Sequence, residues 1–373
     1  MNRRRHDTFA LVRAQRGVSL IELMVGVVVA LLATLVITQT LVFAEAQKRT
    51  TTSGSDAQVN GALALYSLQR DLQSAGYGLT ISRTALGCEI RAQYNGTNFT
   101  WTLAPVVITA GTNGAPDSVQ VLGSDKDSYS IVAPIITNHP RTAANFFVSS
   151  ALGIADGDMM LAVPETPDAA NWCSVFQVTN SNAGPGDGLG NNKVNHNSGL
   201  SNWNQPTNSV FPTDGYQVGS YLVNLGRFTS RTYSVSARQR LQQADFSTTN
   251  GTTSTRDVFN NIVQLRAFYG KDTSGDGIVD SYDNTTPTTQ AGWAQVLTVR
   301  VAIVARSAQY ERDVVTSSNP LWNVGAAVPV AGAATCGSSE CVTLKIDTLT
   351  DWQHYRYKVY ETTVPLRNML WHS

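Results

Sequence analysis

The feature that most constrains the fold is an apolar segment that follows a basic N-terminus. Val18 to Ala44 reads VSLIELMVGVVVALLATLVITQTLVFA, and Glu22 is its only ionisable side chain. The uncharged run that starts at Leu23 spans about 33 Å as an α-helix, close to the thickness of a hydrocarbon core. We therefore predict a transmembrane helix over residues 18–45. Arginines on its N-terminal side keep that end in the cytoplasm by the positive-inside rule, so the rest of the chain is expected outside.

The net charge of zero conceals two oppositely charged segments in this 373-residue chain. The first seventeen residues carry five arginines and one aspartate, or +4, which leaves 22 basic and 26 acidic groups, or −4, in the remainder. Only 14% of the residues are charged, against about 25% in an average soluble domain. This composition is typical of a loop-rich extracytoplasmic protein and gives no electrostatic argument for nucleic-acid binding.

Glu22 is an exception within the apolar segment. A charged side chain costs about 2.5 to 3.5 kcal/mol near the centre of a membrane helix and usually marks function. Glu22 closes the sequence GVSLIE, which begins at Gly17 and resembles the class III signal of type IV prepilins. In that family a Gly precedes the cut and a Glu lies fifth in the mature chain. The resemblance implies that a prepilin peptidase removes the basic leader, residues 1–17, on the cytoplasmic side and that the new N-terminal residue, Val18, is methylated.

The same geometry suggests a physical role for Glu22. When helices bundle in a filament, its carboxylate can neutralise the new amine of Val18 on its own or a neighbouring subunit, because a buried charge needs a partner. Family members most often have Phe at the first mature position, so Val18 leaves the efficiency of methylation open. The alternative is an uncleaved single-span anchor in which Glu22 lies near the cytoplasmic interface.

Residues 46–78 are expected to continue the helix with one apolar face. Small and apolar residues recur at steps of three and four, at Gly61, Leu65, Leu68, Leu72 and Ala75. Gly76 and Gly78 are expected to end this amphipathic helix.

Residues 79–373 are expected to form a β-rich head on the periplasmic or extracellular side. Alternation and β-branched residues predict strands over Trp293–Ser307 and His354–Tyr360. Shorter strands are predicted over Val119–Leu122, Asp158–Val163, Ser174–Thr179, Ser230–Val235 and Asn261–Tyr269. Residues 180–208 have almost no apolar periodicity and are expected to form a long surface loop. The predicted fold class is α+β, a long N-terminal helix packed on an antiparallel β-sheet-rich head.

Several longer stretches narrow the resemblance within the pilin group. They are LQRDLQSAGYG (68–78), CSVFQVT (173–179), VFNNIVQLRAFYGKDTSGDGIVDSY (258–282), LTVRVAIVARSAQYE (297–311) and YRYKVYETTVPLRN (355–368). In this order they are similar to PilW-type minor pilins, which implies a type IV pilin-like fold. The resemblance further implies a low-abundance subunit that starts pilus assembly on the inner-membrane assembly platform and supports twitching motility. Such a subunit would join other minor pilins and the major pilin, and would end near the pilus tip beneath a tip adhesin.

Two other functions fit the same architecture. A minor pseudopilin of a type II secretion system has the same helix and processing. A monomeric, membrane-tethered binding protein with a sugar or adhesive site near Trp203 belongs to a different class.

Residues 272–283 have the spacing of a calcium loop. Oxygen donors fall at positions 1, 3, 5, 9 and 12 of such a loop, with a Gly at position 6 and a backbone carbonyl at position 7. The ligand residues would be Asp272, Ser274, Asp276, Ile278 through its carbonyl, Asp280 and Asp283. Ser274 replaces the usual Asp or Asn, and Asp283 is shorter than the usual bidentate Glu. Two interpretations therefore stay open, a Ca²⁺ site without EF-hand helices and an ion-free hairpin tip; no other cofactor is expected.

The four cysteines are an even set outside the membrane, where disulfides persist. We favour a bridge from Cys336 to Cys341, which closes a small Gly/Ser loop, and by elimination a bridge from Cys88 to Cys173. Zinc is the rival, but the sequence has no CxxC pair with a His at ligand spacing.

An enzyme is not expected. The histidines are scattered, at positions 6, 139, 196, 354 and 372, and no nucleophile elbow, Walker loop, dinucleotide motif or HExxH motif is present.

Overall fold

The structure is a computed structural model that describes residues 17–79, 85–124, 132–179, 192–204 and 210–370. Residues 1–16 of the predicted leader lie outside the described residues. The chain divides into two compact units, the first ending at Ser53 and the second starting at Gly54. The helix α1 (Leu20–Ser74) contributes residues to both units.

The first unit consists, in its described part, of the N-terminal portion of α1. Leu20–Glu45 is 26 residues long and, by length and composition, apolar enough to cross a membrane. Its large apolar side chains are exposed in the isolated chain. The hydroxyls of Thr34, Thr38 and Thr40 donate to backbone carbonyls one turn earlier, so these polar groups are satisfied inside the helix. This segment can serve as a membrane anchor.

In the second unit, α1 packs on β-sheet through the predicted apolar face. Ala64, Leu68 and Leu72 are fully buried there. The helix ends at Ser74, earlier than predicted, and Gly76 and Gly78 follow in turns with φ of 74° and 71°. These left-handed conformations, which favour glycine, stop the helix.

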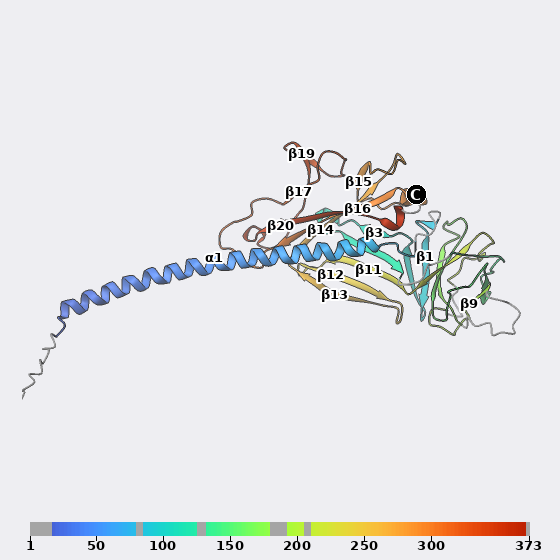
Figure 1. The fold of residues 1–373 in the computed structure, drawn as a ribbon, viewed down its shortest axis with the longest axis horizontal. Helices are drawn as coiled ribbons and strands as arrows, with labels where there is room; N and C mark the ends of the chain where they lie inside the picture. The colour runs from blue at the N-terminus through green and yellow to red at the C-terminus, as the bar shows by residue number, and fades with distance from the viewer. Residues whose placement is uncertain (1–16, 80–84, 125–131, 180–191, 205–209, 371–373) are drawn as a thin grey trace, which may run out of the picture. The chain divides into compact units, whose positions relative to one another are not determined.

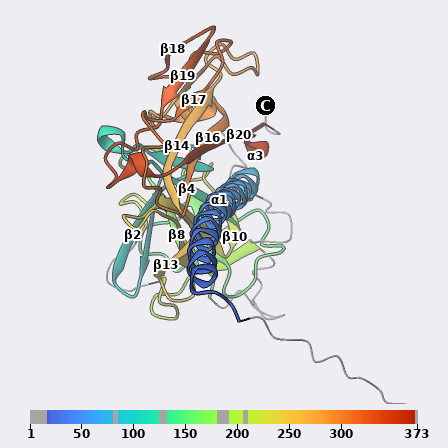
Figure 2. The ribbon, with the colours of Figure 1, turned by 90° about the vertical axis from the view of Figure 1, so that its left-hand side faces the viewer.

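Two antiparallel sheets share one core with this part of α1 (Figures 1 and 2). In spatial order, the five-stranded sheet contains β13 (Thr252–Asn260), β12 (Arg240–Ser247), β11 (Phe228–Val235), β4 (Ser118–Ser124) and β3 (Val106–Thr109). The four-stranded sheet contains β15 (Ser281–Asp283), β14 (Ile262–Lys271), β16 (Val296–Arg306) and β20 (Tyr357–Pro365).

A third, six-stranded sheet has a core on each face. Its order is β2 (Thr97–Thr102), β1 (Glu89–Tyr94), β8 (Cys173–Gln177), β7 (Met159–Val163), β10 (Tyr221–Gly226) and β5 (Ala133–Pro134). The β1–β8 pair is parallel, with Ile90 opposite Cys173, whereas the other pairs of named strands are antiparallel. The predicted antiparallel head therefore contains one mixed sheet.

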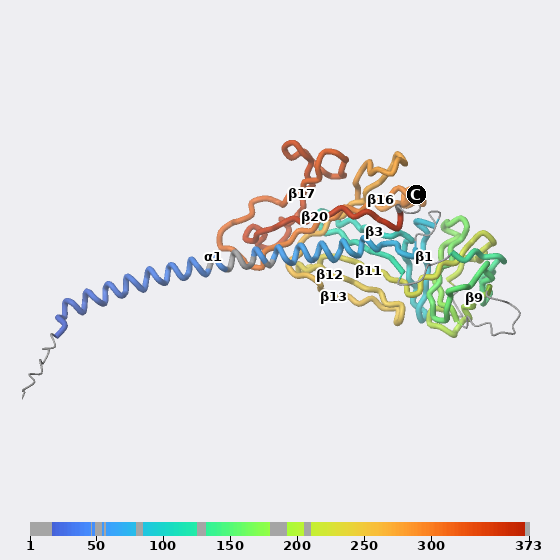
Figure 3. The backbone as a smooth tube through the Cα atoms, viewed as in Figure 1, coloured from blue at the N-terminus to red at the C-terminus, as the bar shows by residue number. Residues whose placement is uncertain are grey.

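Smaller elements complete the head. They are β6 (Asn145–Phe147) paired with β9 (Lys193–Asn195), the sheet of β17 (Leu321–Asn323), β19 (Ser339–Thr343) and β18 (Ala334–Cys336), the helices α2 (Gln290–Ala294) and α3 (Arg367–Leu370), and the 3-10 turns Thr112–Gly114 and Trp352–His354. The three-stranded sheet belongs to the long excursion between β16 and β20, whose path is visible in Figure 3. After that excursion β20 returns to pair with β16.

The predicted strands are present, with two differences. Trp293 lies in α2 instead of the strand, because the Thr289 hydroxyl caps this short helix and the indole is buried edge-on against Tyr269. His354 lies in a 3-10 turn, and β20 starts at Tyr357. The predicted loop 180–208 is described only over 192–204, where it contains β9 and contributes buried side chains to two cores.

Candidate functional site

The predicted processing site lies directly before α1. Gly17, Val18 and Ser19 precede the first helical residue, and Val18 is 70% exposed. The Ser19 hydroxyl accepts the Glu22 N–H at 3.2 Å, so Ser19 caps the helix. Glu22 lies in the first turn, where the positive end of the helix dipole favours a carboxylate. A cut after Gly17 would leave the amine of Val18 two residues before the first residue of α1, and Glu22 lies in the first turn of this helix.

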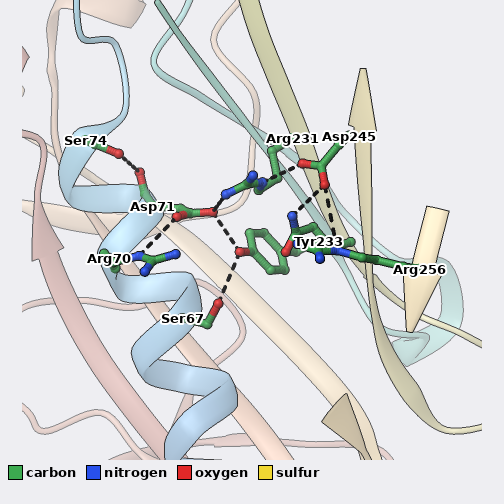
Figure 4. Close-up of polar contacts among 9 residues, drawn as sticks. Ser67, Arg70, Asp71, Ser74, Arg231, Tyr233, Asp245 and Arg256 are labelled. Atoms are coloured by element: carbon green, nitrogen blue, oxygen red, sulfur yellow. Dashed lines mark hydrogen bonds and ion pairs between the residues drawn. The ribbon is translucent and has the colours of Figure 1, made fainter. Parts of the chain in front are cut away.

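A second polar site joins α1 to the five-stranded sheet (Figure 4). Asp71 lies on the buried face of the helix, and one of its carboxylate oxygens accepts hydrogen bonds from Arg231 Nη1 at 2.6 Å and from the Tyr233 hydroxyl at 2.7 Å. Arg231 and Tyr233 are both on β11. Arg231 also donates to Asp245 on β12 at 2.6 Å. We call Asp71, Arg231, Tyr233 and Asp245 the helix–sheet clamp.

Hydrogen bonds keep Arg231 of the helix–sheet clamp charged, and burial keeps Tyr233 protonated. Burial raises the pKa of Tyr233 to about 12, helped by its hydrogen bond to Asp71, so the phenol stays a donor. Burial alone would lower the pKa of Arg231, but its hydrogen bonds to Asp71 and Asp245 outweigh this effect and raise it. The arrangement can hold the helix on the sheet, and its groups are already paired with one another. The sequence signal for it was a single Asp within the otherwise apolar stripe of residues 61–75.

Residues 272–280 form the tip of the hairpin between β14 and β15, and residues 281–283 form β15. The Asp272 carboxylate accepts the backbone N–H groups of Gly275 and Gly277 at 2.6 and 2.8 Å, and the Ser274 hydroxyl at 3.2 Å. The Asp280 carboxylate accepts the N–H groups of Thr273 and Ser274 at 2.7 and 2.8 Å. These two predicted ligands therefore hold the loop through hydrogen bonds.

The other predicted calcium ligands lie around the same tip. Asp276 accepts the Ile278 N–H at 2.8 Å, and Asp283 pairs with the ammonium of Lys271 at 2.7 Å. Over the described residues, no group of three or more His, Cys, Asp or Glu side chains is placed to share a metal ion. Calcium binding by this loop stays a prediction, which titration with Ca²⁺ would test.

Both predicted disulfides are present. Cys88 is bonded to Cys173 and Cys336 to Cys341. With all four cysteines paired, the zinc interpretation is excluded. The first bridge lies beside the parallel pairing of β1 with β8, and the second closes the turn between β18 and β19.

The structure brings together two histidines that lie 57 positions apart in the sequence. The Nε2 atoms of His139 and His196 lie 2.9 Å apart, and both side chains are buried. His139 stacks on Phe146 at a centroid distance of 3.6 Å, and Phe211 contacts both histidines. Burial lowers the pKa of His139 to about 4, and burial together with the charge of His139 lowers that of His196 to about 3, so the pair is neutral near pH 7.

A hollow of about 470 Å³ lies at the loop that contains Trp203. Its lining is polar and includes Gln177, Asn202 and Thr249. Trp203 itself is 3% exposed, and its indole N–H donates to the carbonyl of Thr248 at 2.9 Å. Trp203 is part of the lining of the hollow, but its ring is buried and offers no open face on which a ligand could stack.

Together these features define a class of protein. It is a β-rich head joined to an N-terminal helix that is apolar enough to anchor in a membrane, with a prepilin-like sequence at the start of that helix.

Comparison with known families agrees with this class. The family model of PilW, described as Type IV Pilus-assembly protein W, matches residues 229–368, from β11 into α3. This match confirms the resemblance found in the sequence: over residues 229–368, less than half of the chain, the protein is similar to the PilW family of type IV pilus proteins. Arg231 and Tyr233 of the helix–sheet clamp lie within the matched part. No curated protein and no solved structure matches the chain significantly.

Proposed function

We propose that this protein is a minor pilin that starts or supports assembly of a type IV pilus. The observation that carries the proposal is the start of α1, two residues after Val18, with Glu22 in its first turn and a PilW-family head on the same chain. After insertion into the bacterial inner membrane, with the head in the periplasm, a prepilin peptidase cuts after Gly17. The amine of Val18 is methylated, and Glu22 neutralises it when helices bundle.

In this proposal the protein acts as a structural subunit and not as an enzyme. The assembly platform extracts it with other minor pilins, and the subunits end near the pilus tip beneath an adhesin, at the cell surface. The helix–sheet clamp transmits pulling forces between α1 and the head, because it joins the helix to β11 and β12 by charge-assisted bonds.

The two alternatives differ in partners. A minor pseudopilin of a type II secretion system would be cut in the same way but would associate with secretion components. A tethered binding protein would use the hollow at Trp203 and would not need Glu22 for association with other chains.

The test compares variants expressed in the native host. Gly17→Leu should remain at precursor size, while Glu22→Ala should be cut normally and be absent from pili. Glu45→Ala, at the opposite end of the apolar segment, is the matched control and should behave as wild type. Detergent-solubilised wild-type protein should co-purify with other pilins. Recovery of secretion-system subunits instead would favour the pseudopilin. Absence of the wild-type protein from pili, with no pilin co-purifying, would favour the tethered monomer, and normal assembly of Glu22→Ala would refute the role proposed for Glu22.

A further inference from the structure

Hydrogen bonds fix the two walls of the hollow of about 470 Å³ that lies at Trp203. One wall is the loop 199–203, and the other consists of Thr248 and Thr249 in the turn between β12 and β13. The Trp203 indole N–H donates to the Thr248 carbonyl at 2.9 Å, and the Tyr94 hydroxyl donates to the Thr249 carbonyl at 3.0 Å. The hollow is therefore formed before a ligand enters, which lowers the entropic cost of binding.

The first wall is also tied to the end of β8 through Gln177. The Gln177 Nε2 donates to the Gly157 carbonyl at 2.9 Å, and its Oε1 accepts the Ser201 hydroxyl. The Ser201 oxygen accepts the Trp203 backbone N–H at 3.1 Å. A carboxamide nitrogen carries two N–H groups and a hydroxyl oxygen has two lone pairs. Gln177 therefore keeps one donor, and Ser201 keeps one acceptor, for a ligand.

The second wall presents two hydroxyl groups. Within the described part of the chain, the side-chain hydroxyls of Thr248 and Thr249 make no hydrogen bond. A hydroxyl group rotates freely and can either donate or accept. The two walls together offer donors and acceptors on both sides of one hollow, which is the arrangement that a ligand with several hydroxyl groups can use.

The charge of the lining indicates a neutral ligand. No Asp or Glu among the described residues lines the hollow, and its arginine, Arg227, already interacts with another group of the protein. Leu200 is 61% exposed and adds an apolar contact. The volume lies within the range of about 300–1,000 Å³ that ligand sites have. A neutral sugar combines hydroxyl groups with apolar C–H edges and therefore matches this lining.

We propose that this hollow binds a neutral oligosaccharide of hexose units. Thr248 and Thr249 exchange hydrogen bonds with the hydroxyl groups of the sugar. Gln177 donates to a further sugar oxygen, Ser201 accepts from a sugar hydroxyl, and Leu200 contacts the C–H groups of the ring. The site fits a pilus subunit and a tethered monomer equally, so it does not depend on the assembly of a pilus.

The test uses the full chain in a detergent without a sugar headgroup, with maltotriose, mannotriose and trigalacturonic acid as probes. Saturation-transfer NMR should show binding of at least one of the two neutral sugars, and weaker binding of the acid. Thr248→Val and Thr249→Val each remove a hydroxyl that has no partner in the protein, so the fold should be kept. Each should weaken binding by about two- to tenfold, the effect of one lost hydrogen bond. Thr255→Val, on exposed β13 and outside the lining, is the matched control and should leave the affinity unchanged.

Three results would overturn the proposal. The first is no binding of either neutral sugar at a concentration of about 10 mM, which corresponds to very weak affinity. The second is tighter binding of trigalacturonic acid than of both neutral sugars, because charge would then select the ligand. The third is unchanged affinity in the folded Thr248→Val/Thr249→Val double variant. Leu200→Asp, at an exposed position, keeps the test valid if the double variant unfolds, and it should also weaken binding of the neutral sugar; unchanged affinity in this variant would count against the site.

Discussion

Asp71 is expected to be the polar side chain on which the attachment of α1 to the sheet depends most. Its side chain is 10% exposed, that of Arg231 is 35% exposed, and Tyr233 is fully buried. Asp71→Asn removes the charge but keeps an oxygen that can accept from Tyr233. A hydrogen bond to a charged group contributes about 1.5–3 kcal/mol. Because Arg231 is partly hydrated and keeps Asp245 as a partner, we expect a loss of about 2 kcal/mol in the free energy of unfolding.

Asp71→Ala should cost more than Asp71→Asn. It also leaves the buried Tyr233 hydroxyl without its short acceptor, since the remaining contact, to the Ser67 hydroxyl, is 3.4 Å long. An unsatisfied buried donor adds about 1–3 kcal/mol, so the total loss should be about 3–5 kcal/mol.

Urea unfolding followed by tryptophan fluorescence of the full chain in detergent would measure both losses. The matched control is Asp257→Asn, which removes an ion pair with Arg240 on the exposed β12–β13 hairpin. It should leave the unfolding midpoint nearly unchanged. If Asp71→Asn and Asp71→Ala shifted the midpoint no more than this control does, the helix–sheet clamp would not hold α1 in place.

Three further predictions concern other parts of the head. Gly61→Ala should lower the melting temperature despite its better helix propensity, because a Cβ at this position would clash with the ring of Tyr360; Gly54→Ala, where a Cβ meets no atom within 4 Å, is the control. The neutral pair of His139 and His196 should stabilise the head fully above pH about 6.5, the unfolded-state pKa of histidine, and lose this contribution as the pH falls toward 4, by up to about 1.4 kcal/mol per pH unit for each histidine. Melting curves between pH 4.5 and 7.5 would measure this, and an equal slope in the His139→Gln/His196→Gln double variant would contradict it. Chelation of divalent cations should lower the melting temperature if the loop 272–283 binds Ca²⁺; an unchanged melting temperature would refute the calcium interpretation and leave the hydrogen bonds of Asp272 and Asp280 as what holds the loop.

The sequence predicted those features whose signal is local. The apolar helix, the turn at Gly76 and Gly78, and most strands follow from periodicity and backbone preference within short windows. The disulfide pairing followed from one short loop and an even count of cysteines. Strand β16 shows where prediction from local pattern stops. Both of its faces contribute side chains to a core, so most of its residues are apolar, and the alternation that would tell a buried face from an exposed one is weak.

The features that the sequence did not predict depend on contacts between distant residues. Asp71 meets its partners on β11 about 160 positions later in the chain. His139 and His196 meet only because two strands and their loops fold around one aromatic core. The parallel β1–β8 pairing is likewise a matter of chain topology, which residue type does not encode. Local pattern therefore predicts elements, and long-range packing determines which polar residues become a site.

The most direct test of the central claim is mass spectrometry of sheared, purified pili from the native host. We predict a peptide from this chain that starts at Val18 and carries one methyl group on its amine. This peptide should be lost from the pilus fraction of the Glu22→Ala strain, although the protein is still cut in the membrane. A chain that stays in the membrane fraction with residues 1–17 attached, and that is absent from pili, would refute the proposed role as a processed pilus subunit.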